Sequence, residues 1–118
     1  MSNVQAGKLG EQAAAKLLAK NGYKILDRNF RSKLGEIDIV AQEGNILVFV
    51  EVKTRWSPKF GTPEEAVTPW KIKSIIRTGN YYKLLHPATP DLMRIDVVAV
   101  EVSVNRVTSA RLIKNATG

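Results

Sequence analysis

The sequence contains no cysteine and a single histidine, His86, among its 118 residues. Without cysteine the chain cannot form disulfides, thiolate zinc sites or iron–sulfur clusters, and it has no cysteine nucleophile. A single histidine excludes multi-histidine metal sites and most catalytic triads. Any catalysis by this chain therefore has to use carboxylates, lysine or a hard metal ion.

Long apolar segments are also missing. No segment approaches the roughly 18 consecutive apolar residues of a membrane span, and the first residues, MSNVQAGKLGEQ, lack the hydrophobic stretch of a signal peptide. We find no internal repeat and no low-complexity tract. These absences favour a cytoplasmic protein, and the length predicts one domain over residues 1–118.

Positive charge is the unusual feature of the composition. Eighteen lysines and arginines against eleven aspartates and glutamates give a net charge of +7 at pH 7. An excess of this size favours polyanionic partners, either nucleic acid or an anionic membrane surface. The charge alone does not choose between these two partners.

Hydrophobic periodicity predicts two helices and four to five strands. A helix is expected over 7–20, and a second begins with Thr68 as N-cap and Pro69 in its first position. The apolar stripe of the second helix is Ile72, Ile75, Ile76, Gly79 and Tyr82. Strand patterns occur at 23–30, 36–41, 46–52 and 94–102, with a weaker final strand at 106–113. Because a helix connects the third and fourth strands, the order predicts a mixed sheet flanked by helices, in the α/β class.

Two neighbouring strands carry acidic residues where apolar ones are expected. The two-residue period of a strand groups Glu36, Asp38 and Val40 on one face. By the same rule Glu51 and Lys53 share a face of the next strand. The two strands thus predict a concentration of charge on one side of the sheet.

The turn between these strands sets their register. A two-residue turn at Gly44-Asn45 places Asp38 directly opposite Glu51, and Glu36 opposite Lys53. A turn centred one residue earlier pairs Glu36 with Glu51 instead. The acidic residues cluster in either register.

Like charges that face each other destabilise a sheet, so the Asp38–Glu51 pair requires compensation. One carboxyl can be protonated, a basic side chain can lie between the two, or a divalent cation can bind both. Magnesium fits the third option because it takes one or two carboxylates, keeps several waters and accepts phosphate oxygens. Lys53 then points into the same site, where it can stabilise charge on phosphorus or help to deprotonate water. The alternative is a solvated strand face, with Glu36 paired to Lys53 and Asp38 to an arginine.

Glu11 adds a carboxylate from the first helix. It shares a helical face with Gly7, Ala14 and Leu18, which is the face expected to meet the sheet. From there it can reach the metal site. A glutamate in a first turn can equally serve only to complement the helix dipole.

Four segments in this order resemble the small bacterial YraN family: GKLGEQAAAKLLAKNGYKIL, GEIDIVA, FVEVKTR and RIDVVAV. The resemblance covers about residues 7–100. YraN proteins fall within the restriction-endonuclease-like superfamily, whose active sites follow a D…(D/E)xK pattern. The resemblance therefore implies a restriction-endonuclease-like core that hydrolyses phosphodiester bonds with one or two magnesium or manganese ions.

The family pattern assigns roles by position. Asp38 and Glu51 become metal ligands, the carbonyl of Val52 another ligand, and Lys53 the catalytic lysine. Glu11 resembles the helix glutamate of archaeal Holliday junction resolvases. The implied substrate is DNA, branched or damaged DNA included, in preference to RNA. Because resolvases need two active sites to cut two strands, a homodimer is one arrangement that the resemblance allows.

Five basic residues are candidates for holding nucleic acid: Arg55, Lys59, Lys71, Lys73 and Arg77. The first two follow the acidic strand, and the others lie on the second helix. For the helix residues the simpler interpretation is the solvated face of an amphipathic helix. Lys71 additionally matches a lysine of the family pattern.

Three further residue types have two interpretations each. Trp56 and Trp70 can stack on an unpaired base or pack at the edge of the core, and we favour packing for Trp70. Asp96 interrupts an apolar strand; it either supports the acidic site or pairs with Arg94, and we favour the structural role. His86 either caps the second helix or serves as a ligand, and we favour the cap.

The sequence therefore predicts a metal-dependent nuclease that acts on DNA. The alternative is a nucleic-acid-binding or scaffolding protein that keeps the fold without turnover. A peripheral membrane protein is the weakest interpretation, because neither predicted helix combines a strongly basic face with large exposed apolar residues.

Overall fold

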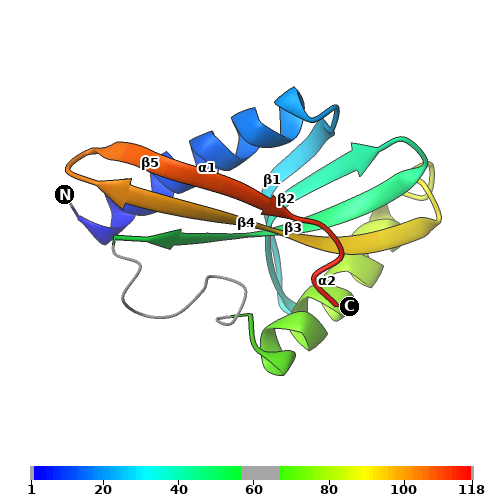
Figure 1. The fold of residues 1–118 in the computed structure, drawn as a ribbon. Coiled ribbons are helices and arrows are strands. Elements are labelled where there is room, and N and C mark those ends of the chain that lie inside the picture. The colour runs from blue at the N-terminus through cyan, green and yellow to red at the C-terminus, as the bar shows by residue number, and fades with distance from the viewer. Residues whose placement is uncertain (1, 57–66, 118) are drawn as a thin grey trace.

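Each of the two helices precedes a run of consecutive strands in the computed structural model, which describes residues 2–56 and 67–117 (Figure 1). In chain order the elements are α1 (Asn3–Lys20), β1 (Lys24–Ser32), β2 (Gly35–Glu43), β3 (Ile46–Arg55), α2 (Pro69–Leu85), β4 (Leu92–Ser103) and β5 (Arg106–Ile113). The predicted order is confirmed, and the weak final strand is present as β5.

The described strands form one sheet with the order β1-β2-β3-β4-β5. Only β3 and β4 are parallel among these neighbours, and the other pairs are antiparallel. The parallel pair is the one that α2 connects, because parallel neighbours need a long crossover. The predicted mixed sheet flanked by helices is therefore confirmed.

Both helices begin at side-chain caps. Ser2 accepts a hydrogen bond from the backbone N–H of Gln5 at 3.1 Å, and Gln5 accepts one from the backbone of Ser2 at 2.8 Å. This capping box starts α1 one turn earlier than predicted. Thr68 caps α2 by accepting from the N–H of Lys71 at 3.2 Å, with Pro69 in the first position as predicted.

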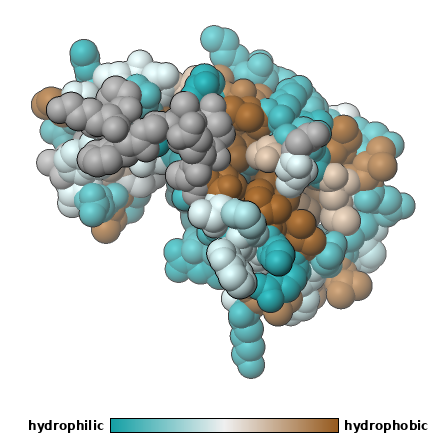
Figure 2. Space-filling model, turned by 60° about the horizontal axis from the view of Figure 1, so that its bottom comes forward, coloured by the Kyte–Doolittle hydropathy of each residue, from teal (hydrophilic) through white to brown (hydrophobic). Residues whose placement is uncertain are grey.

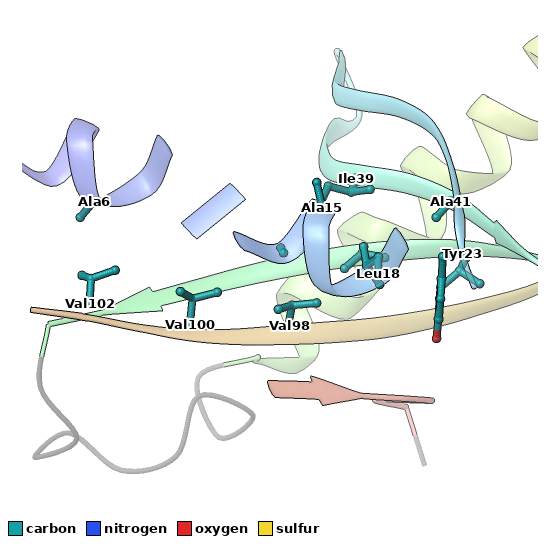
Figure 3. Close-up of a cluster of buried hydrophobic side chains, with 12 residues drawn as sticks. Ala6, Ala15, Leu18, Tyr23, Ile39, Ala41, Val98, Val100 and Val102 are labelled. Atoms are coloured by element: carbon teal, nitrogen blue, oxygen red, sulfur yellow. The ribbon is translucent and has the colours of Figure 1, made fainter. Parts of the chain in front are cut away.

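The helix α1 covers one face of the sheet (Figure 1). In Figure 3 the side chains of Val98, Val100 and Val102 point from β4 toward α1, where Leu18 is fully buried. Small residues on α1, such as Ala14, let the helix pack closely on these valines. Burial of branched side chains under α1 is the larger part of the core.

The helix α2 packs on the opposite face. Its Ile75 and Tyr82 contact a second buried cluster that includes Phe49 of β3. A Cβ atom at Gly79 would lie 2.5 Å from the Phe49 ring, so glycine is required for this approach. Ile76, which the periodicity assigned to the buried stripe, remains 46% exposed. Figure 2 shows apolar side chains gathered on this side of the molecule. Within the described residues neither helix is long and apolar enough to cross a membrane.

Candidate functional site

The hairpin between β2 and β3 has the predicted register. Glu43 pairs with Ile46 across the Gly44-Asn45 turn, and the ladder continues to the pair Ile39–Val50. Beyond this pair a side chain replaces the backbone as hydrogen-bond partner: Oδ2 of Asp38 accepts a hydrogen bond from the backbone N–H of Val52 at 2.8 Å. Asp38 is therefore fixed between the two strands at the point where their backbone pairing ends.

The prediction that Glu36, Asp38 and Val40 share one face of β2 is only partly right. Ile37 and Val40 both pack against α2, whereas Ile39 packs under α1, so the two-residue alternation breaks near Asp38. Asp38 itself lines a hollow on the α1 side together with Glu36. Val40 therefore does not share their face. The break coincides with an irregularity in β1: between the pairs Arg28–Ile39 and Phe30–Ile37, Asn29 has a φ of +53°.

Glu51 is the buried acid of the site, with 6% of its surface exposed. Burial and the neighbouring Asp38 carboxylate raise the pKa of Glu51 to about 7, although Lys71 and Lys53 oppose the shift. Lys71 belongs to the first turn of α2, and its Nζ lies 3.4 Å from Oε2 of Glu51. The predicted cluster of two acids and Lys53 is thus present, with Lys71 as a second ammonium.

Glu11 and Glu36 stand beside this cluster in the α1 side hollow, which has a volume of about 390 Å³. The Asn29 amide lies 3.4 Å from Oε2 of Glu11 and donates to it. Glu36 forms an ion pair with Arg31 of β1 at 3.4 Å. The predicted Glu36–Lys53 pairing is therefore wrong, because the β2–β3 ladder ends before it reaches Glu36 and the neighbouring strand supplies the cation instead.

The donors at the site fit a divalent cation. Asp38 and Glu51 provide two carboxylates, and the Val52 carbonyl is an oxygen of the same strand. No group of three or more acidic or histidine side chains converges within residues 2–56 and 67–117. Magnesium or manganese tolerates so few protein ligands when water and phosphate complete the shell. Burial first, and then the Asp38 carboxylate, raise the pKa of Glu51, and a cation bound between the two carboxylates would favour their ionised forms.

The candidate phosphate-binding residues are distributed more widely than expected. Lys71 contacts Glu51, and Lys73 Nζ lies over the Trp70 ring, 5.6 Å from its centre. Arg77 is exposed on α2, and Arg55 is half-buried at the end of β3. Lys59 lies outside the described residues. The structure thus brings Lys71 to the acids and leaves Lys73 and Arg77 along the helix.

Trp70 does not pack at the edge of the core, because 79% of its surface is exposed. Its place in the first turn of α2 puts it on the outer side of the helix, where it contacts Lys73. Trp56 at the end of β3 is 49% exposed. The favoured interpretation of Trp70 was therefore wrong. Both rings offer a flat apolar surface to solvent.

Asp96 belongs to a separate buried network and not to the acidic site. Arg94 donates to it twice, from Nε at 2.8 Å and from Nη2 at 2.9 Å, as the structural interpretation predicted. The Tyr23 hydroxyl donates at 2.7 Å and the backbone N–H of Asn115 at 2.9 Å. Arg94 also donates to Glu43 at 2.7 Å. These contacts join the segment between α1 and β1, the end of β2, β4 and the C-terminal segment.

His86 closes α2 as predicted. It is the C-cap of the helix, and its ring stacks on Tyr82 with 4.0 Å between the ring centres. The ring nitrogen Nδ1 lies 3.0 Å from the Tyr82 carbonyl oxygen. The single histidine therefore has a structural role, remote from Asp38 and Glu51.

Comparison with known proteins gives one consistent family. The model of "Uncharacterised protein family UPF0102" matches residues 10–100. A UPF0102 protein of Caldicellulosiruptor saccharolyticus is 50% identical over 117 residues, which are 98% of this chain and 99% of the relative. A UPF0102 protein of Symbiobacterium thermophilum is 46% identical over 112 residues, which are 95% of each chain. One of Moorella thermoacetica is 46% identical over 117 residues, 98% of each chain. The names of these relatives state no activity.

Proposed function

We propose a function for this chain from the premise that it belongs to UPF0102, the YraN family: a metal-dependent endonuclease that hydrolyses phosphodiester bonds of DNA. One observation carries the proposal. Glu51 is buried beside a second carboxylate, Asp38, and its pKa rises to about 7. Two acids in a poorly solvated place, with lysines next to them, match the needs of cation-assisted phosphate chemistry.

The roles follow from the positions of the side chains. Asp38, Glu51 and the Val52 carbonyl would hold a magnesium or manganese ion, which neutralises phosphate charge and lowers the pKa of water when bound. The hydrogen bond from the Val52 N–H keeps the Asp38 carboxylate in one orientation. Lys53 donates hydrogen bonds to the phosphate, where negative charge grows as water adds to phosphorus. The attacking water gives up a proton to solvent, the P–O bond to the leaving oxygen breaks, and that oxygen takes up a proton from solvent.

Glu11 is a positioning residue in this proposal. It lies in the same hollow as Asp38, and Asn29 holds its carboxylate. A homodimer would supply two such sites, one for each strand of a branched DNA. The net charge of +7 supports a polyanionic partner such as DNA.

A second candidate function is nucleic-acid binding without turnover, and the Lys71–Glu51 ion pair favours it. An ammonium 3.4 Å from the buried carboxylate balances part of the charge inside the protein. A site neutralised in this way needs no metal ion to be stable. The two functions therefore differ in whether a divalent cation binds at all.

A cleavage panel separates the two candidates. Labelled duplex, single-stranded and four-way junction DNA, and an RNA of the same sequence, are incubated with magnesium or manganese. We expect cation-dependent cleavage of DNA that Asp38→Ala and Lys53→Ala abolish. The matched control is Asp91→Asn, because Asp91 is fully exposed and pairs only with Lys83 among the described residues. Equal activity in the wild type and Asp38→Ala would refute the nuclease.

A further inference from the structure

A polar hollow opens next to Asp38 on the α1 side of the sheet. Its volume is about 390 Å³, and its walls come from the first turns of α1 and from β1, β2 and β3. Figure 1 shows the start of α1 near the carboxyl ends of β3 and β4. The hollow therefore gives solvent and solutes a path to Asp38 from the α1 side.

Two glycines on α1 have opposite roles at this place. A Cβ atom at Gly10 would lie 1.9 Å from the Thr54 hydroxyl oxygen, so Gly10 allows α1 to approach β3. A Cβ atom at Gly7 would meet nothing within 4 Å, although Gly7 lines the hollow. Glycine in a helix interior costs about 1 kcal/mol relative to alanine. The chain bears this cost at Gly7 without a packing reason, and the result is open space.

The charges in the hollow are arranged in two levels. The three carboxylates of the hollow, Glu11, Glu36 and Asp38, are half-buried, whereas its two cations, Lys8 and Arg31, are exposed at the opening. Arg31 is 73% exposed, and its pairing with Glu36 at 3.4 Å is weak in water. An acidic interior with a basic opening suits a polyanion whose phosphates bind the cations at the opening, on either side of the acids.

We propose that a nucleic-acid strand enters this hollow, with Lys8 and Arg31 binding the phosphates next to the one that reaches Asp38. The backbone then runs over α1 and β1, and not along α2. The basic residues of α2 are less suited, because Lys71 contacts Glu51 and Lys73 lies on the Trp70 ring. The inference rests on the proposed function for the identity of the ligand and goes beyond it in the location of the strand.

Fluorescence anisotropy with labelled single-stranded and junction DNA, in EDTA so that no strand is cut, tests the location. The double variant Lys8→Gln/Arg31→Gln is compared with Lys73→Gln/Arg77→Gln, which removes the same charge from α2. We expect the first to weaken DNA binding about tenfold and to reduce the log–log salt slope by nearly two. The second should change affinity less than twofold. Equal losses, a larger loss for the α2 pair, or no binding by the wild type would overturn the inference.

Gly7→Leu tests the hollow itself. Leucine favours the helix and meets no atom at its Cβ, so we expect an unchanged or higher melting temperature. We expect DNA affinity to fall about tenfold, as for the double variant, while manganese affinity, measured by calorimetry, stays within twofold. Gly7→Ala is the smaller control. Wild-type DNA affinity in Gly7→Leu contradicts the inference.

The two proposals can fail separately. If cleavage depends on Asp38 while Gly7→Leu and Lys8→Gln/Arg31→Gln bind DNA like the wild type, only the location is wrong. If the wild type never cleaves but the binding pattern holds, the nuclease fails and the hollow remains a nucleic-acid site.

Discussion

The ammonium of Lys71 lies 3.4 Å from the Glu51 carboxylate, and the Glu51 side chain is only 7% exposed. The contact joins the first turn of α2 to the acidic strand β3. Because Lys71 follows the N-cap Thr68 closely, the start of α2 determines where this charge is placed. Lys71 is therefore an internal counter-ion of Glu51, and it would compete with the divalent cation that we propose for this site.

The first prediction concerns this competition. Lys71→Met removes the ammonium and keeps the aliphatic part of the side chain. We expect manganese to bind about fivefold to tenfold more tightly, equal to roughly 1 kcal/mol after allowance for solvent screening. Titration calorimetry measures it. Lys73→Met is the control, and weaker manganese binding in Lys71→Met than in the control would contradict the competition.

The second prediction follows from the raised pKa of Glu51. Its folded value is about 7 against an ordinary 4.5, so the folded state holds the proton more tightly than the unfolded state. The associated stability is present below pH 4.5 and is lost as the pH rises through 7. In EDTA, Glu51→Gln should be more stable than the wild type at pH 8 by roughly 2–3 kcal/mol.

Urea denaturation from pH 4 to 8 measures this difference. The variant should lack the fall in stability between pH 5 and 7 that the wild type shows. Glu36→Gln is a suitable control, because Glu36 lies near the site but pairs with Arg31 at the surface. A parallel fall in wild type and Glu51→Gln would show that another group titrates.

The hairpin register was predictable because its cause is local. Gly44 has φ of +55°, which favours glycine, and the two-residue turn fixes which residues face each other. The orientation of Asp38 was not, because it depends on where the backbone ladder ends. Asn29 on the neighbouring strand has φ of +53° and holds Glu11, and no periodicity in the sequence marks such an irregularity. The residues of the site could thus be predicted from the sequence. That Asp38 lines the hollow on the α1 side while Glu51 contacts Lys71 of α2 could not.

The surroundings of Asp96 show the same limit. Its pairing with Arg94, two residues away, could be proposed from the strand pattern. The bond from Tyr23 joins residues 73 positions apart, so only the folded chain brings them together. Trp70 was misassigned for a related reason, since a helix periodicity does not tell which side of the first turn the sheet will cover.

The third prediction concerns this network. Burial opposes ionisation of Asp96, yet hydrogen bonds from Arg94, Asn115 and Tyr23 lower its pKa below the ordinary 3.8. Asp96→Asn leaves the Arg94 cation without its main partner, so we expect a loss of about 3 kcal/mol at pH 7. The stability from ionised Asp96 is present above about pH 4 and is lost as the pH falls through the lower folded value.

Urea denaturation at pH 7 and pH 3 tests it. The difference between the wild type and Asp96→Asn should shrink at the lower pH. Asp91→Asn, at a fully exposed position, should change stability little at either pH. The same difference in stability between wild type and Asp96→Asn at pH 7 and pH 3 would mean that ionisation of Asp96 does not contribute to stability.

The fourth prediction concerns the packing of α2, the helix of Lys71, on the sheet. Thr78 on α2 is fully buried, and its hydroxyl has no hydrogen-bond partner among the described residues. Valine has nearly the same shape without the unpaired hydroxyl, so Thr78→Val should raise stability by about 1 kcal/mol. Thr78→Ser keeps the hydroxyl and removes the methyl group, so it should lower stability by about 1 kcal/mol.

Opposite signs for the two variants in urea denaturation at pH 7 are the expected result. A loss in Thr78→Val would show that the hydroxyl is hydrogen-bonded in solution. Because Thr78 and Lys71 share one helix, a more stable Thr78→Val should keep α2 seated on the sheet and leave manganese affinity unchanged. A changed affinity would mean that the α2 contact to Glu51 depends on this hydroxyl.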